Sequence, residues 1–264
     1  MSIPRLLAAL AVTVAVAPAV ADDHDVAEAV AEAHGRDRVP ANAVLRGQLT
    51  VDFGGRRTID AADLWFHSNG ALVRLESGGE VAVFDGSTAW ATPEFPIGQP
   101  RFQLLTWPYF AVMPFKLDDG GANLEPLEPA PLREGEEPSE RARLTFDAGV
   151  GDSPDDWYVL YLNAQNQLVA SGYIVTYGQS AEQAEAAPHA IVYRDFADVP
   201  GVDGEATGVV LSTSWDFYNW TADGGIVGEP IGRVTLENLA FAEPPEGAFE
   251  PPEGSQEVAP PLAE

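Results

Sequence analysis

A histidine close to the amino terminus offers the most specific metal chemistry in this chain. An apolar run over residues 6–17 and the Ala-Val-Ala of residues 19–21 form the pattern that signal peptidase cleaves. Cleavage after Ala21 would leave a mature chain that begins Asp22-Asp23-His24. A free amine, two backbone amides and a third-position imidazole form a square of four nitrogens suited to Cu(II) or Ni(II). His24 is therefore a candidate Cu(II) ligand, although a histidine also falls at such a position by chance.

His189 and Asp195 are the candidates for acid–base catalysis. In an extended strand they share a face with Ile191 and Tyr193, so a histidine and carboxylate pair could form there. The same spacing is also that of an ordinary strand. The chain has no Gly-x-Ser-x-Gly elbow, Walker loop, His-Glu-x-x-His motif or EF-hand loop. A hydrolase-type enzyme with a site near His189 and Asp195 is thus kept as an alternative, and no catalytic residue is assigned.

The remaining polar clusters have simpler interpretations. His34 ends a predicted helix, where the partial negative charge of the helix terminus would favour an imidazolium. The carboxylates of residues 152–156, and those of residues 118–119 with Asn123, could hold Ca²⁺, but neither group has the spacing of an EF-hand. In a chain with 41 acidic residues, such clusters also arise as solvated turns. We therefore expect a structural role for His34 and solvated turns for the two acidic groups.

The composition excludes several classes of partner. The chain carries 41 acidic and 14 basic residues, for a formal net charge of -27. Such a surface repels phosphate backbones and anionic headgroups, so we expect neither nucleic-acid binding nor docking on an acidic bilayer. After the signal peptide no segment reaches about 18 uninterrupted apolar residues, so no transmembrane anchor is expected. The absence of cysteine rules out disulfides, thiolate chemistry and a lipoprotein anchor. The predicted location is the periplasm or the medium.

We expect the segment 101–119 to form the centre of the fold. It is rich in large apolar side chains, and its middle carries no charge, so other elements must cover it. Pro108 and Pro114 each remove an amide donor and restrict the preceding residue. We therefore predict a short helix before Trp107 and an irregular apolar plug after it.

Short segments rich in aromatic and β-branched residues provide the cover. Val44–Phe53 alternates apolar and polar residues, and so does the segment 209–219. Asn69-Gly70 is the strongest hairpin signal in the chain. These patterns predict a mainly β (α+β) fold, in which a curved antiparallel half-barrel sheet of about ten strands wraps around short helices and the plug. The expected strands are 44–53, 64–68, 71–76, 80–84, 142–147, 157–162, 168–177, 189–196, 209–220 and 231–241.

The expected organisation is one domain over residues 22–242, preceded by the signal peptide of residues 1–21. A short amphipathic helix capped by Asp25 opens the domain and ends before Gly35. Residues 118–141 are rich in Pro, Glu and Gly, which indicates an acidic excursion and not a second core. The tail over 243–264 repeats Glu-Pro-Pro-Glu-Gly, a composition that cannot bury enough surface to order itself, so we expect it to be disordered.

Six short stretches are distinctive together: residues 33–35, 107–110, 114–117, 173–177, 188–193 and 215–220. They resemble an uncharacterised family of exported bacterial proteins, which in turn is similar to the LolA/LolB lipoprotein-carrier superfamily. The resemblance implies an open antiparallel half-barrel around helices, with an apolar cavity able to take acyl chains. This chain departs from it in being far more acidic than such a carrier and in its long acidic insertion after Leu117.

The leading functional hypothesis is an exported, non-catalytic binding protein that holds a lipid or another apolar ligand in the hollow of the half-barrel. A proline-broken apolar segment packs less tightly than a regular helix and could move aside for such a ligand. An envelope interaction or scaffold protein, binding a protein partner through its acidic segments, is a further alternative to the enzyme. The same aromatic residues could equally be plain core. The residues expected to line the cavity are Trp65, Trp107, Phe110, Met113, Phe115, Trp215 and Phe217.

Overall fold

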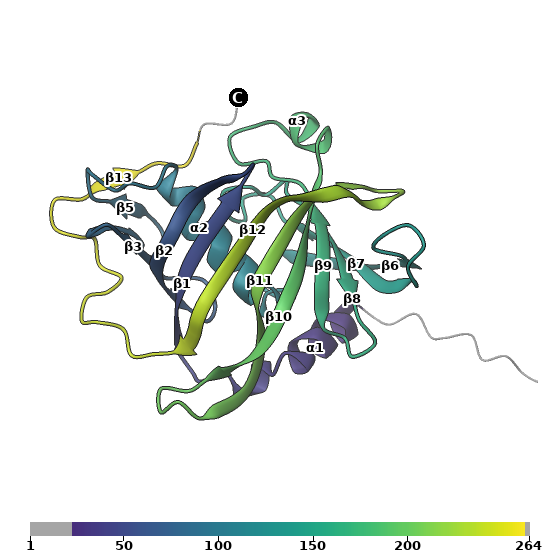
Figure 1. The fold of residues 1–264 in the computed structure, drawn as a ribbon, viewed down its shortest axis with the longest axis horizontal. Helices are drawn as coiled ribbons and strands as arrows, with labels where there is room; N and C mark the ends of the chain where they lie inside the picture. The colour runs from purple at the N-terminus through teal and green to yellow at the C-terminus, as the bar shows by residue number, and fades with distance from the viewer. Residues whose placement is uncertain (1–22, 262–264) are drawn as a thin grey trace, which may run out of the picture.

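A computed structural model describes residues 23–261, with side chains from Val26 onward, and shows one antiparallel sheet curved around a central helix (Figure 1). The order of strands across the sheet is β13-β5-β4-β3-β2-β1-β12-β11-β10-β9-β8-β7-β6. The strands are β1 (Val44–Phe53), β2 (Arg56–His67), β3 (Val73–Ser77), β4 (Glu80–Phe84), β5 (Ala89–Ala91), β6 (Ala122–Ala130), β7 (Ser139–Phe146), β8 (Tyr158–Leu162), β9 (Leu168–Tyr173), β10 (His189–Pro200), β11 (Ala206–Thr221), β12 (Gly225–Phe241) and β13 (Gln256–Val258).

This architecture confirms the predicted mainly β fold with a curved antiparallel sheet around short helices. β1 and β4 have the predicted bounds, and the Asn69-Gly70 turn joins β2 to β3 as expected. The sheet has thirteen strands instead of about ten, because β5, β6 and β13 lie in segments without an alternating pattern of apolar residues. The sheet is continuous because β1 pairs with β12, which joins the first hairpins to the last strands.

The central helix α2 (Pro100–Val112) contacts β3, β4 and β5 on one side and β11 on the other. It runs through Pro108, so the prediction of a helix that stops before Trp107 was wrong. A proline inside a helix costs about 3 kcal/mol, and burial of the surrounding apolar side chains against the sheet offsets that cost. After α2 the chain forms the 3-10 turn η2 (Met113–Phe115), which contains the second proline, Pro114.

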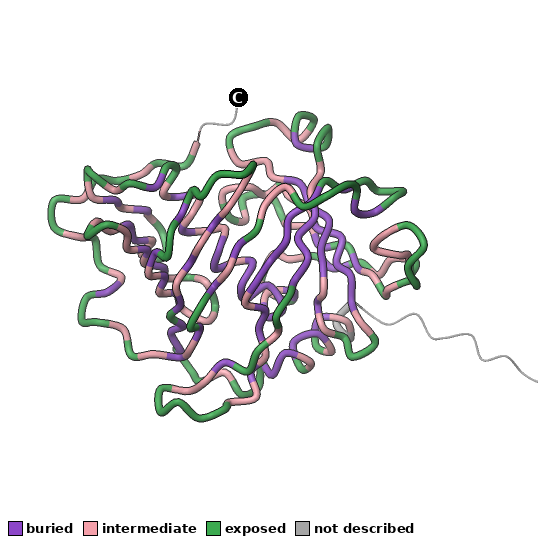
Figure 2. The backbone as a smooth tube through the Cα atoms, in the orientation of Figure 1, coloured by how far each residue is buried: buried purple, intermediate pink, exposed green. Residues whose placement is uncertain are grey.

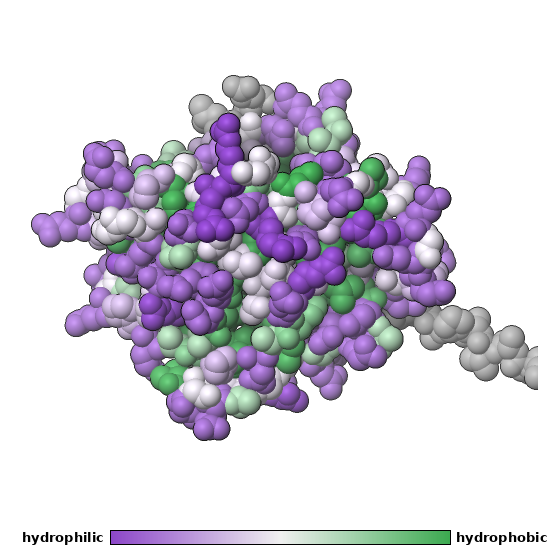
Figure 3. All heavy atoms as spheres, viewed as in Figure 1, coloured by the Kyte–Doolittle hydropathy of each residue, from purple (hydrophilic) through white to green (hydrophobic). Residues whose placement is uncertain are grey.

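The two faces of the sheet have different surroundings (Figure 2). The concave face and α2 enclose the main core, which includes Leu49, Leu64 and Phe66. The face turned toward the viewer in Figure 3 is mostly hydrophilic. A second apolar cluster, built from residues of β8 to β12 and including Tyr161 and Trp220, is separate from the main core. Over these strands the sheet therefore has apolar side chains on both faces, and every residue of β8 is buried.

The acidic segment 118–141 is more regular than expected. It contains the outermost strand β6, which carries Pro126 and Pro129 and pairs with β7. After β6 the chain reaches the β11–β12 hairpin, where the amide of Ile226 donates to the carbonyl of Leu132. Leu132 packs against the second apolar cluster. This part of the excursion thus serves as a cover for the sheet, which the composition did not reveal.

The carboxyl-terminal tail is also ordered, contrary to expectation, over residues 243–261. Ala248 is buried, and its carbonyl accepts a hydrogen bond of 3.2 Å from the Arg74 guanidinium. Strand β13 then pairs with β5. Farther along, Pro261 lies against Gly178, in the segment that follows β9. Backbone pairing and two fixed contacts order a tail whose composition alone would not.

The other helices are short. Helix α1 (Asp23–Ala33) begins two residues before the predicted cap Asp25 and contacts β6 and η2. Gly35, two residues after its end, has a left-handed backbone conformation. The 3-10 turn η1 (Arg36–Arg38) follows, and α3 (Ala181–Glu185) lies between β9 and β10. Over the described residues 23–261, the helices are all too short or too polar to cross a membrane. The expected signal peptide, residues 1–21, lies outside the described residues.

Candidate functional site

A cavity of about 630 Å³, partly open to solvent, lies between α2 and the concave face of the sheet. One wall is α2, and the opposite wall is built from inward-facing residues of β1, β7, β8, β9 and β11. Four connecting segments complete it: the β2–β3 turn, the segment after η2, the β7–β8 loop over residues 147–157 and the segment after β9. The residues that line it are Val51, Phe53, Thr58, Gly70, Phe102, Gln103, Leu105, Thr106, Trp107, Tyr109, Phe110, Lys116, Asp119, Gly120, Ala122, Phe146, Val150, Gly151, Asp152, Ser153, Asp156, Tyr158, Tyr173, Val175, Tyr177 and Phe217.

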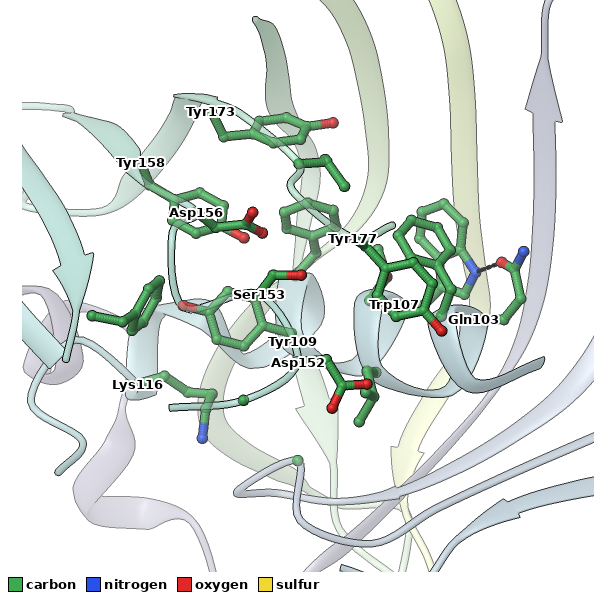
Figure 4. Close-up of a pocket in the computed structure, with 18 of the residues that line it drawn as sticks. Gln103, Trp107, Tyr109, Lys116, Asp152, Ser153, Asp156, Tyr158, Tyr173 and Tyr177 are labelled. Carbon is green, nitrogen blue, oxygen red and sulfur yellow. Dashed lines mark hydrogen bonds between the residues drawn. The ribbon is translucent and has the colours of Figure 1, made fainter. Parts of the chain in front are cut away.

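Three of the seven predicted ligand-binding residues line this cavity. They are Trp107 and Phe110 on α2 and Phe217 on β11. The three rings pack together, with Phe217 at a centroid distance of 6.3 Å from Trp107 and 6.1 Å from Phe110. The Nε1 of Trp107 donates a hydrogen bond of 2.7 Å to Gln103, one helical turn earlier (Figure 4). That these residues contact a ligand stays a prediction.

Three other predicted residues are part of the solid core. Met113, Phe115 and Trp215 are buried but do not line the cavity. The sulfur of Met113 accepts a hydrogen bond of 3.3 Å from the Tyr193 hydroxyl. Met113 and Phe115 lie in η2, beyond the end of α2, and the Trp215 ring lies 6.5 Å from the Phe110 ring. Their aromatic or apolar character indicated burial but not the position of the empty space.

Trp65 lies on the opposite face of the sheet. Its neighbours in β2, Leu64 and Phe66, are fully buried in the core, and the alternation of a strand turns Trp65 outward. There the guanidinium of Arg46 lies 5.0 Å from the centre of its ring. The placement of Trp65 in the cavity was therefore wrong.

A polar group of side chains occupies one end of the cavity. Figure 4 shows Asp156, Ser153, Tyr109 and Tyr158 on the side opposite Gln103 and Trp107. The Tyr109 and Tyr158 rings are 5.8 Å apart, and Tyr158 stacks on Tyr173 at 5.8 Å. Burial raises the pKa of all three tyrosines, and the nearby charge of Asp156 adds to the effect. The phenols are neutral and can donate or accept hydrogen bonds.

Asp156 is the most perturbed carboxyl group of this site. Burial raises its pKa to about 6, and the two hydrogen bonds from Thr176 oppose this only in part. The Thr176 amide and hydroxyl donate to the same oxygen, Oδ1, at 2.6 and 2.7 Å. A carboxyl group with this pKa in an apolar cavity changes charge close to neutral pH.

The opening of the cavity is bordered by two ion pairs. Arg101, in the first turn of α2, donates from its Nη2 to Asp152 in the β7–β8 loop at 2.8 Å. Lys116 pairs with Asp119 and also donates to the carbonyl of Asn69 at 2.9 Å. These contacts hold three loops of the cavity opening in place.

The other sequence candidates are not brought together into a site. His189 and Asp195 are six residues apart in β10, which places them about 20 Å from each other along the strand. Asp195 is exposed and has a left-handed backbone, with φ of 49°. The Nδ1 of His189 is buried without a partner among the described residues. The predicted catalytic pair is therefore not formed.

The carboxylates of the acidic clusters make structural contacts, and Asp152 is largely shielded from water and not part of a fully solvated turn. Asp152 and Asp156 bind Arg101 and Thr176, and Asp118 pairs with Arg36 at 2.5 Å. Within the described part of the chain, no three acidic or histidine side chains are grouped as metal ligands would be. His24 lies among residues whose side chains the structure does not describe, so its binding of Cu(II) stays a prediction.

Several cavity residues were missed by the sequence reasoning. Tyr109 stood in the predicted plug, and Tyr158 and Tyr173 stood in predicted strands, so each could have been selected as an aromatic residue near the apolar segment. Asp156 carried no such signal, because it looks like any other residue of an acidic turn. Its position depends on the β7–β8 loop folding back onto α2, which only the structure shows.

The fold and the cavity define an antiparallel half-barrel that encloses apolar space against a buried helix. No protein-family model matches the chain. A search of curated proteins also finds no match.

Solved structures with a similar fold do exist. A LolA superfamily protein from Nitrosomonas europaea has a TM-score of 0.50 and 12% identity, over 84% of this chain and 96% of that one. A putative outer membrane lipoprotein-sorting protein domain from Vibrio parahaemolyticus has a TM-score of 0.43 and 10% identity, over 86% and 97%. A DUF1329 family protein from Desulfovibrio piger has a TM-score of 0.46 and 9% identity, over 85% and 95%. The similarity to the Nitrosomonas protein confirms the predicted resemblance to the LolA/LolB superfamily at the level of the fold.

Proposed function

We propose that this protein is an exported, non-catalytic binding protein that holds an apolar or lipid-like ligand in the cavity beside α2. The observation that carries the proposal is the cavity itself, because about 630 Å³ is well within the range of small-molecule sites. A ligand that binds in this cavity binds only the folded protein, so it stabilises the protein against unfolding.

The lining supports an apolar ligand. Phe53, Phe110 and Phe217 form a continuous aromatic wall, with ring centroids 4.9 Å apart for the first and last of these. Such rings gain from burying apolar carbon, and they offer no donor or acceptor to a purely polar molecule.

The experiment is a binding assay with N-phenyl-1-naphthylamine, an uncharged probe whose fluorescence rises in apolar surroundings. We expect saturable binding by the wild-type protein, with displacement by a long-chain alcohol. Leu105→Trp places an indole into the cavity from the surface of α2 and should weaken probe binding by about tenfold or more. A probe signal that does not saturate, or that the alcohol does not reduce, would contradict the proposal.

Trp65→Ala is a control for Leu105→Trp, because it changes a tryptophan outside the cavity. Trp65 lies on the outer face of the sheet beside Arg46, so Trp65→Ala should leave probe affinity unchanged. Equal weakening by Trp65→Ala and Leu105→Trp would indicate a general effect on folding and not occupation of the cavity.

Export rests on the first 21 residues of the sequence, which have the features of a cleaved signal peptide. Amino-terminal sequencing of the protein from the periplasm or medium should begin at Asp22. The same material tests the copper site: a d–d absorption band on addition of Cu(II), lost in His24→Ala, is the expected result.

A further inference from the structure

One carboxylate of the cavity has no positively charged partner. Asp119 is paired with Lys116, and Asp152 is paired with Arg101. Among residues 23–261, no Lys or Arg lies within ion-pair distance of Asp156. The ionised form of Asp156 thus places an uncompensated negative charge in the cavity wall.

The hydrogen bonds of Asp156 leave one of its oxygens available. Thr176 donates both its amide and its hydroxyl to Oδ1, and these two bonds fix the orientation of the carboxyl group. Oδ2 receives no hydrogen bond from the described part of the chain. A fixed carboxylate with one free oxygen is an acceptor site for a ligand donor.

A second polar atom beside Asp156 also lacks a partner. The Tyr109 hydroxyl is buried and makes no hydrogen bond within the described residues. Tyr109 and Asp156 both line the cavity, and Figure 4 shows them at the same end of it. A buried hydroxyl without a partner is unfavourable, and a polar group of the ligand would satisfy it.

We propose that the ligand is an amphipathic molecule with a protonated amine at its polar end, bound by Asp156 Oδ2 with the Tyr109 hydroxyl as the second partner. This inference rests on the proposed function of the cavity. An ammonium group supplies three donors and the missing positive charge. A carboxylate or phosphate would meet a like charge, and an alcohol would leave the charge of Asp156 uncompensated.

The test compares decylamine, decanol and decanoate as competitors of N-phenyl-1-naphthylamine near neutral pH. We expect the amine to bind about tenfold or more tightly than the alcohol, and the acid to bind most weakly. In Asp156→Asn the ratio of amine to alcohol affinity should fall close to one. Tyr109→Phe should lower the same ratio about threefold, since it removes one hydrogen bond.

The large negative charge of the whole protein also attracts amines, so a control of equal charge is needed. Asp155 is the exposed neighbour of Asp156, does not line the cavity and makes no ion pair in the described structure. Asp155→Asn should therefore retain the full preference for the amine. Equal binding of the three competitors, or a preference that survives Asp156→Asn, would overturn the inference alone. Failure of the probe to bind at all would overturn the proposed function as well.

Discussion

Arg101 and Asp152 form a two-point ion pair that joins the first turn of α2 to the β7–β8 loop, 51 residues farther along the chain. Their side chains are 9% and 14% exposed, so the pair is largely shielded from water. Asp152 lines the cavity, and the guanidinium of Arg101 lies 5.5 Å from the centre of the Phe84 ring. The pair therefore ties the loop beside the cavity to both the helix and the sheet.

Removing one member of this pair should destabilise the protein. Asp152→Asn leaves Arg101 charged and partly buried, and we expect the free energy of unfolding to fall by about 2 kcal/mol, less than for a completely buried pair. Urea denaturation with an unchanged m-value measures this. Asp155→Asn, in the same loop but exposed, is the control and should change stability by less than about 0.5 kcal/mol. Equal effects of the two variants would show that the pair contributes nothing.

The raised pKa of Asp156 predicts a pH dependence of stability. Its pKa is about 6 in the folded protein and about 4 in the unfolded chain, so the folded state binds the proton more tightly. Asp156 therefore contributes roughly 2 to 3 kcal/mol to the free energy of unfolding below about pH 4. This contribution is lost as the pH rises through about 6. Asp156→Asn should not show this loss. The check is a series of urea denaturations of both proteins between these pH values, and parallel pH profiles would contradict the assignment.

The lowered pKa of His34 predicts a pH dependence of stability opposite in sign to that of Asp156. Its Nδ1 donates to the Val210 carbonyl at 2.8 Å, and the Leu168 amide donates to its Nε2 at 3.1 Å. Burial lowers the pKa of His34, despite the opposing hydrogen bond to Val210. The imidazole is thus neutral, and the expectation of an imidazolium at the end of α1 was wrong.

The unfolded chain takes up the proton on His34 before the folded protein does. Stability should therefore decrease as the pH falls below about 6.5, the ordinary histidine pKa. Thermal unfolding at several pH values should show this decrease in the wild type and not in His34→Gln. His67→Gln, on β2, is the matched removal of another histidine and should retain the acid-induced loss.

Gly172 on β9 should not tolerate a side chain. A Cβ built there would lie 2.5 Å from Cε2 of the Trp220 ring, which is buried and donates a hydrogen bond to Tyr161. We expect Gly172→Ala to cost about 2 kcal/mol of stability, because a ring held on both sides cannot move aside. Gly98→Ala is the control, since a Cβ there meets no atom within 4 Å. If Gly172→Ala left the free energy of unfolding unchanged, the second apolar cluster would have to be loosely packed.

The sequence predicted the fold better than it predicted the site. Strands such as β1 and β4 were found with the correct bounds because their apolar residues alternate and turns flank them. The same rule failed for β6, an edge strand that contains two prolines, and for β13, an edge strand of only three residues. Their order comes from backbone pairing: β6 pairs with β7, the next strand along the chain, and β13 pairs with β5, which is far from it in the sequence.

Aromatic character indicated burial and could not locate a cavity. Trp107 and Trp215 are both buried tryptophans, yet only Trp107 borders empty space, because cavities are what packing leaves over from several distant elements. Trp65 was misplaced because the face of β2 that turns inward is set by its neighbours Leu64 and Phe66. Asp156 was missed because its environment is created by α2 and the β7–β8 loop together.

An open sheet normally presents two rows of unpaired backbone groups to other molecules, and here both rows are poor templates for intermolecular pairing. β13 is only three residues long, and Pro260 follows it closely. At the other margin, β6 contains Pro126 and Pro129, which have no amide proton to offer. Together with the mutual repulsion of chains that each carry a net charge of -27, this makes aggregation through strand addition unfavourable, so the half-barrel can remain open without joining copies of itself.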